Sequence, residues 1–184
     1  MKTQAAFPRF QEILAAICTG RSINEILQLV LDQACELVKA HHGSLMRIDK
    51  ESDTLAILGT VGADWSMEKK GERLKIGQGV TGTVAQTGKP YWCADTDKDT
   101  HYVALFPSIK SEIAVPVVID GAVWAVINMD SEEYGAFGEN AAQLLSAYAE
   151  MVSFSIQAHL ARDWFGEKNL EVLMAQLESK VPEV

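Results

Sequence analysis

The chain has 184 residues, a formal net charge of −9 and an apolar fraction of 48%. These values fit one globular domain with a short additional element, and they argue against intrinsic disorder. The 25 acidic residues outnumber the 16 Lys and Arg, which disfavours binding to nucleic acid or to an anionic membrane surface. No apolar run of membrane-spanning length occurs, and the three cysteines are widely spaced, so we expect a cytoplasmic protein.

The first part of the chain predicts two helices followed by a hairpin. Residues 7–40 have apolar side chains at helical spacing, interrupted at Gly20. Ser22 and Glu25 match the capping box that begins a helix. Residues 44–49 and 54–61 then alternate with period two around a polar turn, which is typical of two paired strands.

The middle of the chain is rich in glycine and polar residues. It predicts a short strand and then a short helix that is entered and left through glycine, followed by another strand. These lie at residues 73–76, 77–88 and 90–94. Residues 62–71 have the composition of a loop or a short helix, and residues 95–109 form the longest polar connection.

The clearest element is a hairpin whose apolar strands meet at Asp120-Gly121, because an Asp-Gly pair between apolar runs is a strong hairpin signal. Counting outward from this turn places Glu112 opposite about residue 129. Pro116 cannot donate a ladder hydrogen bond, so we expect a bulge or an unpaired position there. The near-continuous apolar character predicts central strands covered on both faces.

Helical spacing returns over residues 137–160 and resumes from Leu170 after Gly166. The order of elements predicts an α+β fold with an antiparallel sheet and helices on one face.

A glycine motif and three cysteines offer candidate chemistry. Gly77 to Gly82 match G-x-G-x-x-G, and Asp97 lies 20 positions after Gly77, as in dinucleotide-binding folds. The predicted helix is short and a hairpin follows it, which favours backbone turns over a nucleotide site. Cys18, Cys35 and Cys93 are interpreted as structural.

Two further groups of residues are candidates for metal or ligand binding. His41 and His42 are adjacent and would point to opposite faces of a strand, so a solvent-facing strand start is favoured over a metal site. Glu112, Asn128 and Asp130 lie at the open end of the Asp-Gly hairpin. They could hold an amine or a hydroxyl of a small ligand, or they could cap the end of the sheet.

Residues 77–152 resemble a GAF domain. The pieces that carry the resemblance are GQGVTG, GKP before a strand, D-x-x-x-D in the loop, SEIAVPV, a turn with glycine, VINMDS and a helix opened near Phe137. The resemblance extends to about residues 8–162. It implies a six-stranded antiparallel sheet with helices from both chain ends on one face and a small-molecule pocket on the other. It also implies a homodimer formed through the end helices, and a separate output protein as a partner.

Members with different activities are distinguished by particular residues. Free methionine-(R)-sulfoxide reductases are similar at Glu112 and Asp130, but Asn128 stands where they have Asp, and no cysteine lies between residues 94 and 184. Bilin-binding members use a Cys-His pair that is missing here. Cyclic-nucleotide members match only in part, so that ligand stays open.

We therefore expect a sensory GAF domain over residues 1–165, with a C-terminal helical extension over 166–184. The expected function is binding of a small organic ligand of unknown identity, with neither enzymatic activity nor a cofactor or metal. A reductase-like enzyme or a ligand-free dimerisation module is the alternative. The expected ligand contacts are Trp92, His101, Tyr102, Phe106, Glu112, Asn128 and Asp130.

Overall fold

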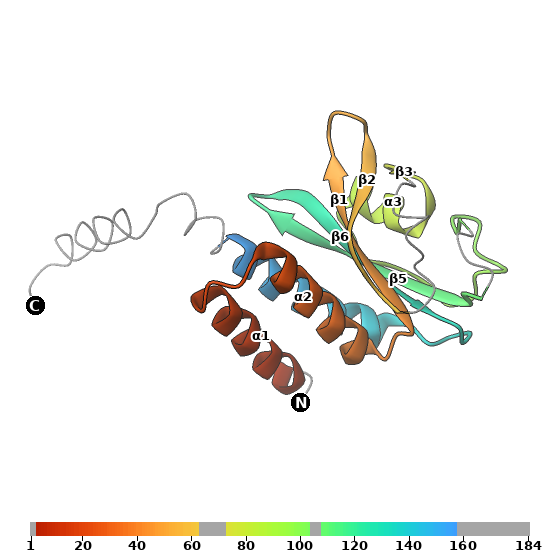
Figure 1. Ribbon diagram of the computed structural model, residues 1–184. Helices are drawn as coiled ribbons and strands as arrows, with labels where there is room; N and C mark the ends of the chain where they lie inside the picture. The colour runs from red at the N-terminus through yellow and green to blue at the C-terminus, as the bar shows by residue number, and fades with distance from the viewer. Residues whose placement is uncertain (1–2, 63–72, 104–107, 158–184) are drawn as a thin grey trace, which may run out of the picture.

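The computed structural model describes residues 3–62, 73–103 and 108–157. Six strands form one sheet in the order β3-β2-β1-β6-β5-β4, and every neighbouring pair is antiparallel (Figure 1). The strands are β1 (His42–Asp49), β2 (Thr54–Val61), β3 (Leu74–Lys75), β4 (Tyr91–Cys93), β5 (Ser111–Ile119) and β6 (Ala122–Ser131). The helices are α1 (Thr3–Cys18), α2 (Ile23–Val38), α3 (Gly79–Thr87) and an unlabelled helix at residues 139–157. The predicted α+β fold is confirmed.

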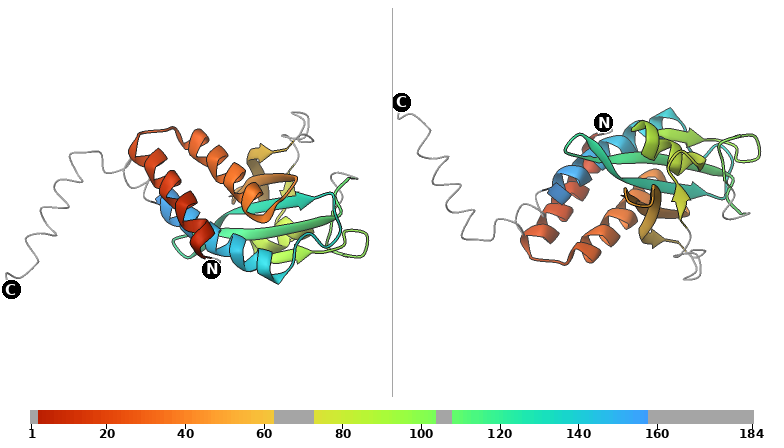
Figure 2. Two further views of the ribbon diagram at one scale, coloured as in Figure 1. Left: turned by 90° about the horizontal axis from the view of Figure 1, so that it is seen from below. Right: turned by 90° about the horizontal axis from the view of Figure 1, so that it is seen from above.

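One face of the sheet is covered by α2 and the helix at 139–157, and α1 packs against α2 (Figure 2). Their apolar side chains pack with Leu45, Ile127 and Met129 of the sheet into the larger core cluster. Tyr148 lies in the centre of this layer, with its hydroxyl 3.1 Å from the carbonyl of Val30 and 3.0 Å from Oε1 of Gln33. Helices from both ends of the domain are therefore joined on the same face.

The opposite face is covered by α3. Val80 and Val84 of this helix pack with Ala114 and Val126 of the central strands in a second core cluster. Successive residues of a strand point to opposite faces, so β5 and β6 contribute to both cores, as their apolar pattern predicts.

The start of α2 confirms the predicted capping box. Oε2 of Glu25 accepts a hydrogen bond of 2.9 Å from the backbone N–H of Ser22, and the Ser22 hydroxyl oxygen accepts one of 3.4 Å from the N–H of Glu25. Gly20 has a φ of 75° just after α1, in the region that favours glycine.

The turn between β5 and β6 is of the predicted kind, but the register differs by one residue. Asp120 and Gly121 have φ values of 51° and 75°, as a two-residue hairpin loop requires. A bulge between Val117 and Val118 then shifts the pairing, so Glu112 lies opposite Asp130 and not residue 129. The bulge lies one residue beyond Pro116, which keeps its place in the register.

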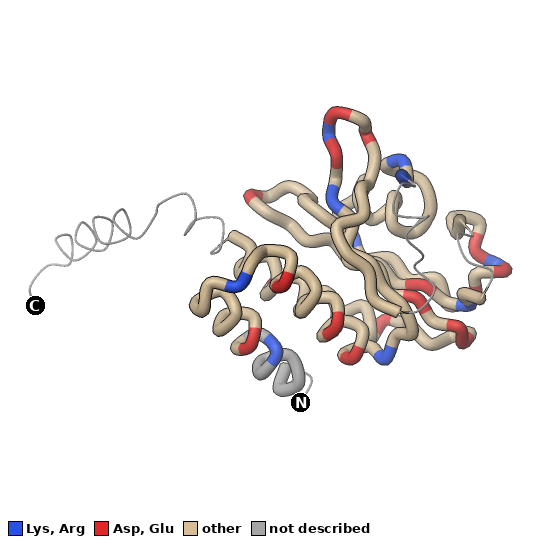
Figure 3. The backbone as a smooth tube through the Cα atoms, in the orientation of Figure 1, with Lys and Arg blue, Asp and Glu red and all other residues tan. Residues whose placement is uncertain are grey.

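The dinucleotide interpretation of the glycine motif is excluded, because α3 has 9 residues and joins antiparallel strands. Lys and Arg are scattered among Asp and Glu over the described elements (Figure 3). None of the helices in the described ranges is long and apolar enough to cross a membrane. The predicted loop at 62–71 and the extension at 166–184 fall wholly or largely outside the described residues.

Candidate functional site

Two carboxyl groups lie side by side on the α3 face of the sheet. Glu112 at the start of β5 and Asp130 at the end of β6 are register partners, so their side chains leave the sheet on the same face. Glu112 is 7% exposed and Asp130 is 5% exposed. A buried pair of carboxyl groups is costly unless protons, donors or a cation compensate it.

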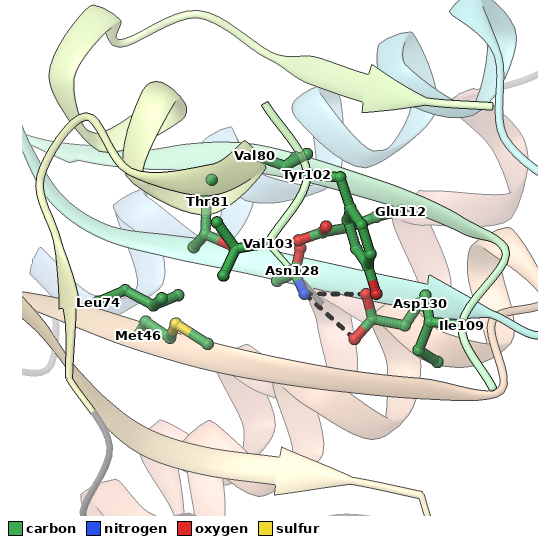
Figure 4. Close-up of a pocket in the computed structure, with 11 residues that line it drawn as sticks. Met46, Leu74, Val80, Thr81, Tyr102, Val103, Ile109, Glu112, Asn128 and Asp130 are labelled. Carbon is green, nitrogen blue, oxygen red and sulfur yellow. Dashed lines mark hydrogen bonds between the residues drawn. The ribbon is translucent and has the colours of Figure 1, made fainter. Parts of the chain in front are cut away.

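Asn128 supplies donors to one of these carboxyl groups. Its Nδ2 lies 3.1 Å and 3.2 Å from the two oxygens of Asp130 (Figure 4). Its Oδ1 is buried and has no hydrogen-bond partner among the described residues, and the same is true of Oγ of Ser44, the residue opposite Asn128 on β1. The site thus contains a buried acceptor, Oδ1 of Asn128, whose hydrogen-bonding capacity is unused within the described ranges.

The first turn of α3 completes the site. Gly77 and Gly79 have φ values of 82° and 71°, which bend the chain into the helix. Gly82 lies so close to β3 that a Cβ there would be 2.6 Å from the carbonyl oxygen of Lys75. This close approach positions Thr81, whose hydroxyl donates a hydrogen bond of 3.2 Å to Oε1 of Glu112.

These groups surround a small pocket with about 30 Å³ of free volume, room for about one water molecule. Tyr102 and Val103 cover it, and the Tyr102 side chain points toward Asp130 in Figure 4. No Lys or Arg is among the described lining residues, which are Met46, Leu74, Gly79, Val80, Thr81, Tyr102, Val103, Ile109, Glu112, Asn128 and Asp130.

The environment favours protonated carboxyl groups. Burial raises the pKa of Glu112 well above its usual value, and repulsion from Asp130 raises it further. Burial also raises the pKa of Asp130, to about 7, against the opposing effects of Asn128 and His42. The pair therefore retains proton occupancy near neutral pH.

The carboxyl pair belongs to a row of residues that crosses four strands. Cys93 of β4 pairs with Glu112, and His42 of β1 pairs with Asp130. Burial, with a further contribution from Asp99, raises the pKa of the Cys93 thiol to about 12. His42 turns its Nε2 toward Glu132, at 3.3 Å from Oε1, while its Nδ1 has no partner in the part of the chain that the structure describes.

The two adjacent histidines have different surroundings. His42 is 6% exposed, which differs from the expected solvent-facing position. The exposed His41 accepts a hydrogen bond at Nδ1 from the N–H of Glu132 and lies near the Ser131 hydroxyl. Both rings therefore bind the chain just after β6. No group of three or more His, Cys, Asp or Glu within the described ranges could hold a metal ion.

Four of the seven predicted contact residues line this pocket: Tyr102, Glu112, Asn128 and Asp130. Trp92 precedes Cys93 on β4 and points to the other face, where it lines a groove with the helix at 139–157. His101 is exposed and packs against the Tyr91 ring. Phe106 lies outside the described residues. Thr81 is a site residue that the sequence analysis did not single out.

The fold and the site define an α+β domain that encloses a small pocket, lined by polar and apolar side chains, between one face of an antiparallel sheet and a short helix. The chain belongs to the GAF domain family, since the family profile described as GAF domain matches residues 20–157. Members of this family bind small molecules in general.

Comparisons with individual proteins give both enzymes and domains of larger proteins. The chain is 31% identical over 85 residues to free methionine-R-sulfoxide reductase of Saccharomyces cerevisiae. This alignment covers 46% of this chain and 47% of that protein. The chain spans about half the length of the curated relatives it matches.

Two solved structures share the fold. The reductase of the same name from Neisseria meningitidis, in complex with its substrate, has a TM-score of 0.72 at 22% identity, covering 83% of this chain and 88% of that chain. The GAF domain of a phosphoenolpyruvate-protein phosphotransferase from Coxiella burnetii has a TM-score of 0.70 at 18% identity, covering 87% of this chain and 97% of that one.

These comparisons correct the expectation that the chain is not an enzyme. The S. cerevisiae relative and the N. meningitidis structure are both named as reductases. The expectation had depended on the absence of a cysteine between residues 94 and 184 and on Asn128 in place of Asp, and the similarity to these named enzymes overturns it.

Proposed function

We propose that the chain binds a free amino acid, with its ammonium group at Glu112 and Asp130. The observation that carries this proposal is the buried carboxyl pair with no cationic side chain among the described lining residues. An ammonium group has three N–H donors and no acceptor. It would supply both the missing positive charge and a donor for Oδ1 of Asn128, which has no partner among the described residues.

The start of α3 supports the placement of the ligand's carboxylate. The first N–H groups of a helix have no partner within the helix, and the helix dipole there favours an anion. Gln78, at the N-cap of α3, makes no side-chain hydrogen bond to these groups. The contact between Thr81 and Glu112 brings this anion-favouring end next to the carboxyl pair. The carboxylate of an amino acid would then lie at the start of α3 while its ammonium group lies at the carboxyl pair.

The size of the pocket defines which part of the ligand is enclosed. The free volume of about 30 Å³ accommodates an ammonium group, which is about the size of a water molecule. The remainder of the ligand must displace the side chains of Tyr102 and Val103, which cover the pocket.

In this proposal, ligand binding also serves signalling. The ligand would change the relative stability of two arrangements of the end helices, which would form a homodimer and contact an output protein. This part of the proposal is supported by β5 and β6. Their side chains on one face of the sheet line the pocket, and their side chains on the opposite face pack against the helical layer.

A second candidate function is reduction of free methionine-R-sulfoxide, which the two reductases named above favour. The reaction would transfer the sulfoxide oxygen to a thiol and give methionine and a sulfenic acid. Cys93 is the cysteine whose register position borders the carboxyl pair, whereas Cys18 and Cys35 lie in α1 and α2. Its raised pKa disfavours the thiolate, so turnover by this route would be slow.

Calorimetry and thermal shifts with free methionine-R-sulfoxide, methionine, other free amino acids and cyclic nucleotides test the binding proposal. A ligand at 100 times its dissociation constant stabilises by about 2.7 kcal/mol, which raises Tm by roughly 5–10 °C. Glu112→Gln should reduce the shift, because Asp130 alone remains to hold the ammonium group, and the exposed turn variant Asp120→Asn should retain it. Binding of a cyclic nucleotide but of no amino acid would overturn the proposal.

A turnover assay with free methionine-R-sulfoxide and a thiol reductant tests the second candidate. Product formation should disappear in Cys93→Ser and persist in Cys18→Ser, since Cys18 is exposed in α1 on the opposite side of the sheet. Equal loss of activity in both variants, or no turnover by the unchanged protein, would exclude Cys93 as the reacting thiol.

A further inference from the structure

The carboxyl pair raises the question of what balances its charge when no ligand is bound. Glu112 comes from β5 and Asp130 from β6, and both are buried. The other titratable side chains around them from the described elements are Cys93 of β4, Asp99 and Tyr102 of the loop after β4, and His42 of β1.

Of these groups only His42 can be cationic, and it is oriented elsewhere. Its Nε2 pairs with Glu132 outside the pocket at 3.3 Å. Cys93, Asp99 and Tyr102 are neutral or negative at physiological pH and increase the cost of a second negative charge. Thr81 donates to Glu112 and Asn128 donates to Asp130, which opposes the rise in each pKa, but neither residue supplies a positive charge to balance two carboxylates.

We propose that a cation entering this pocket displaces a proton held by Glu112 and Asp130, so that ligand uptake is coupled to proton release. This inference depends on the proposed function, because it assigns a proton exchange to the same site. In the exchange one carboxyl O–H bond breaks, its proton passes to solvent water or buffer, and the resulting carboxylate accepts an N–H from the ligand's ammonium group.

The exchange has a definite dependence on pH. The direction of both pKa shifts means that the unliganded pair holds protons in mildly acidic solution. An amino acid keeps its ammonium charge in that range. Proton and ligand therefore compete for the site, and each released proton lowers the apparent affinity about tenfold per pH unit as the pH falls from 7 to 5.

Isothermal titration calorimetry with free methionine-R-sulfoxide in phosphate and in a cationic amine buffer at one pH measures the exchange. Two buffers of different ionisation enthalpy give different observed heats only when protons move. We expect about one or more protons released per ligand at pH 6. Equal heats in both buffers, together with an affinity independent of pH, would overturn the coupling while leaving the proposed binding intact.

The N-acetyl derivative of the same sulfoxide is the matched ligand control, because it has no ammonium group. It should bind at least about tenfold more weakly and release no proton. Proton release on its binding would overturn the proposal. If neither compound binds at any pH from 5 to 8.5, both the coupling and the proposed function are wrong.

Variants identify the source of the proton. In Glu112→Gln the number of released protons should fall, because the remaining carboxyl group no longer has a charged neighbour. In His42→Gln the number should not fall, since His42 faces Glu132 and its charge opposes protonation of Asp130. Loss of proton release in His42→Gln with retention in Glu112→Gln would assign the proton to the histidine and overturn the inference.

Discussion

The hydroxyl of Thr81 in the first turn of α3 donates a hydrogen bond to the carboxyl group of Glu112 on β5. This contact joins a short helix to the strand beneath it through two buried polar side chains. The variant Thr81→Val keeps the shape but removes the donor. We expect a loss of about 1–2 kcal/mol in the free energy of unfolding.

Thermal unfolding checks this, with an expected drop in Tm of roughly 2–8 °C. Thr87→Val at the other end of α3 is the control, because the Thr87 hydroxyl is exposed, where it donates to the Thr83 carbonyl and accepts from the N–H of Lys89. An equal drop in the two variants would show that the loss comes from the helix and not from the contact with Glu112.

The variant Gly82→Ala should destabilise the protein and weaken ligand binding together. A Cβ at this position would lie 2.6 Å from the carbonyl oxygen of Lys75, a backbone atom that can move only with its strand. Overpacking of this kind typically costs about 1–3 kcal/mol. Because α3 would have to move, Val80 and Thr81 would leave their places in the pocket.

Gly138→Ala is the matched control for denaturant unfolding, since a Cβ there meets no atom within 4 Å. Its cost should stay below about 1 kcal/mol. A Gly82→Ala protein with unchanged stability and unchanged ligand affinity would contradict the close contact between α3 and β3.

The carboxyl pair should make stability depend on pH. The pKa of Asp130 is raised from 3.8 to about 7 in the folded protein, so the folded state binds more protons than the unfolded state between these values. The contribution of Asp130 therefore lowers the free energy of unfolding as the pH rises through this range. Removing the carboxyl group in Asp130→Asn should remove this loss.

Chemical denaturation at pH 5 and pH 7 measures the difference between the variant and the unchanged protein. The variant should gain on the order of 2 kcal/mol relative to the unchanged protein between the two pH values. Asp120→Asn, in the exposed β5–β6 turn, should show no such change. If Asp130→Asn were instead more stable relative to the unchanged protein at pH 5 than at pH 7, the pKa of Asp130 would not be raised in the folded state.

The variant Tyr148→Phe should loosen the helical layer. Its hydroxyl is buried between the Val30 carbonyl and Oε1 of Gln33, and its removal leaves both acceptors without this donor. The expected cost is about 1–3 kcal/mol. The control is Tyr134→Phe at an exposed position, which loses a contact with Asp97 and should cost under about 0.5 kcal/mol. Denaturant unfolding measures both variants. Similar losses in the two would contradict this role of Tyr148.

Local sequence signals predicted the elements that depend on near neighbours. The capping box of Ser22 and Glu25 and the turn at Asp120-Gly121 were predictable because each is complete within four residues of sequence. The clustering of Glu112, Asn128 and Asp130 followed from the same turn, because all three belong to the strands that it joins.

Features that depend on packing between distant segments were not predictable. The bulge after Val117 moved the register by one residue, and Pro116 indicates an irregularity nearby without specifying that the register shifts. Thr81 looks like any threonine of a short helix until α3 is placed over β5. The face of the sheet on which Trp92 lies depends on the pairing of Cys93 with Glu112. It could not be predicted before β4 was placed beside β5.

The side chains of β6 alternate between the two cores: Ile127 and Met129 face the helices, whereas Asn128 and Asp130 face the pocket. Sliding β6 by one residue would exchange these sets, placing carboxyl and amide groups under α2 and apolar groups in the pocket. Translation of this strand is therefore mechanically blocked. A structural change that begins at the pocket can therefore reach the helical layer only as a bend or twist of β6, and not as a shift of the strand along its axis.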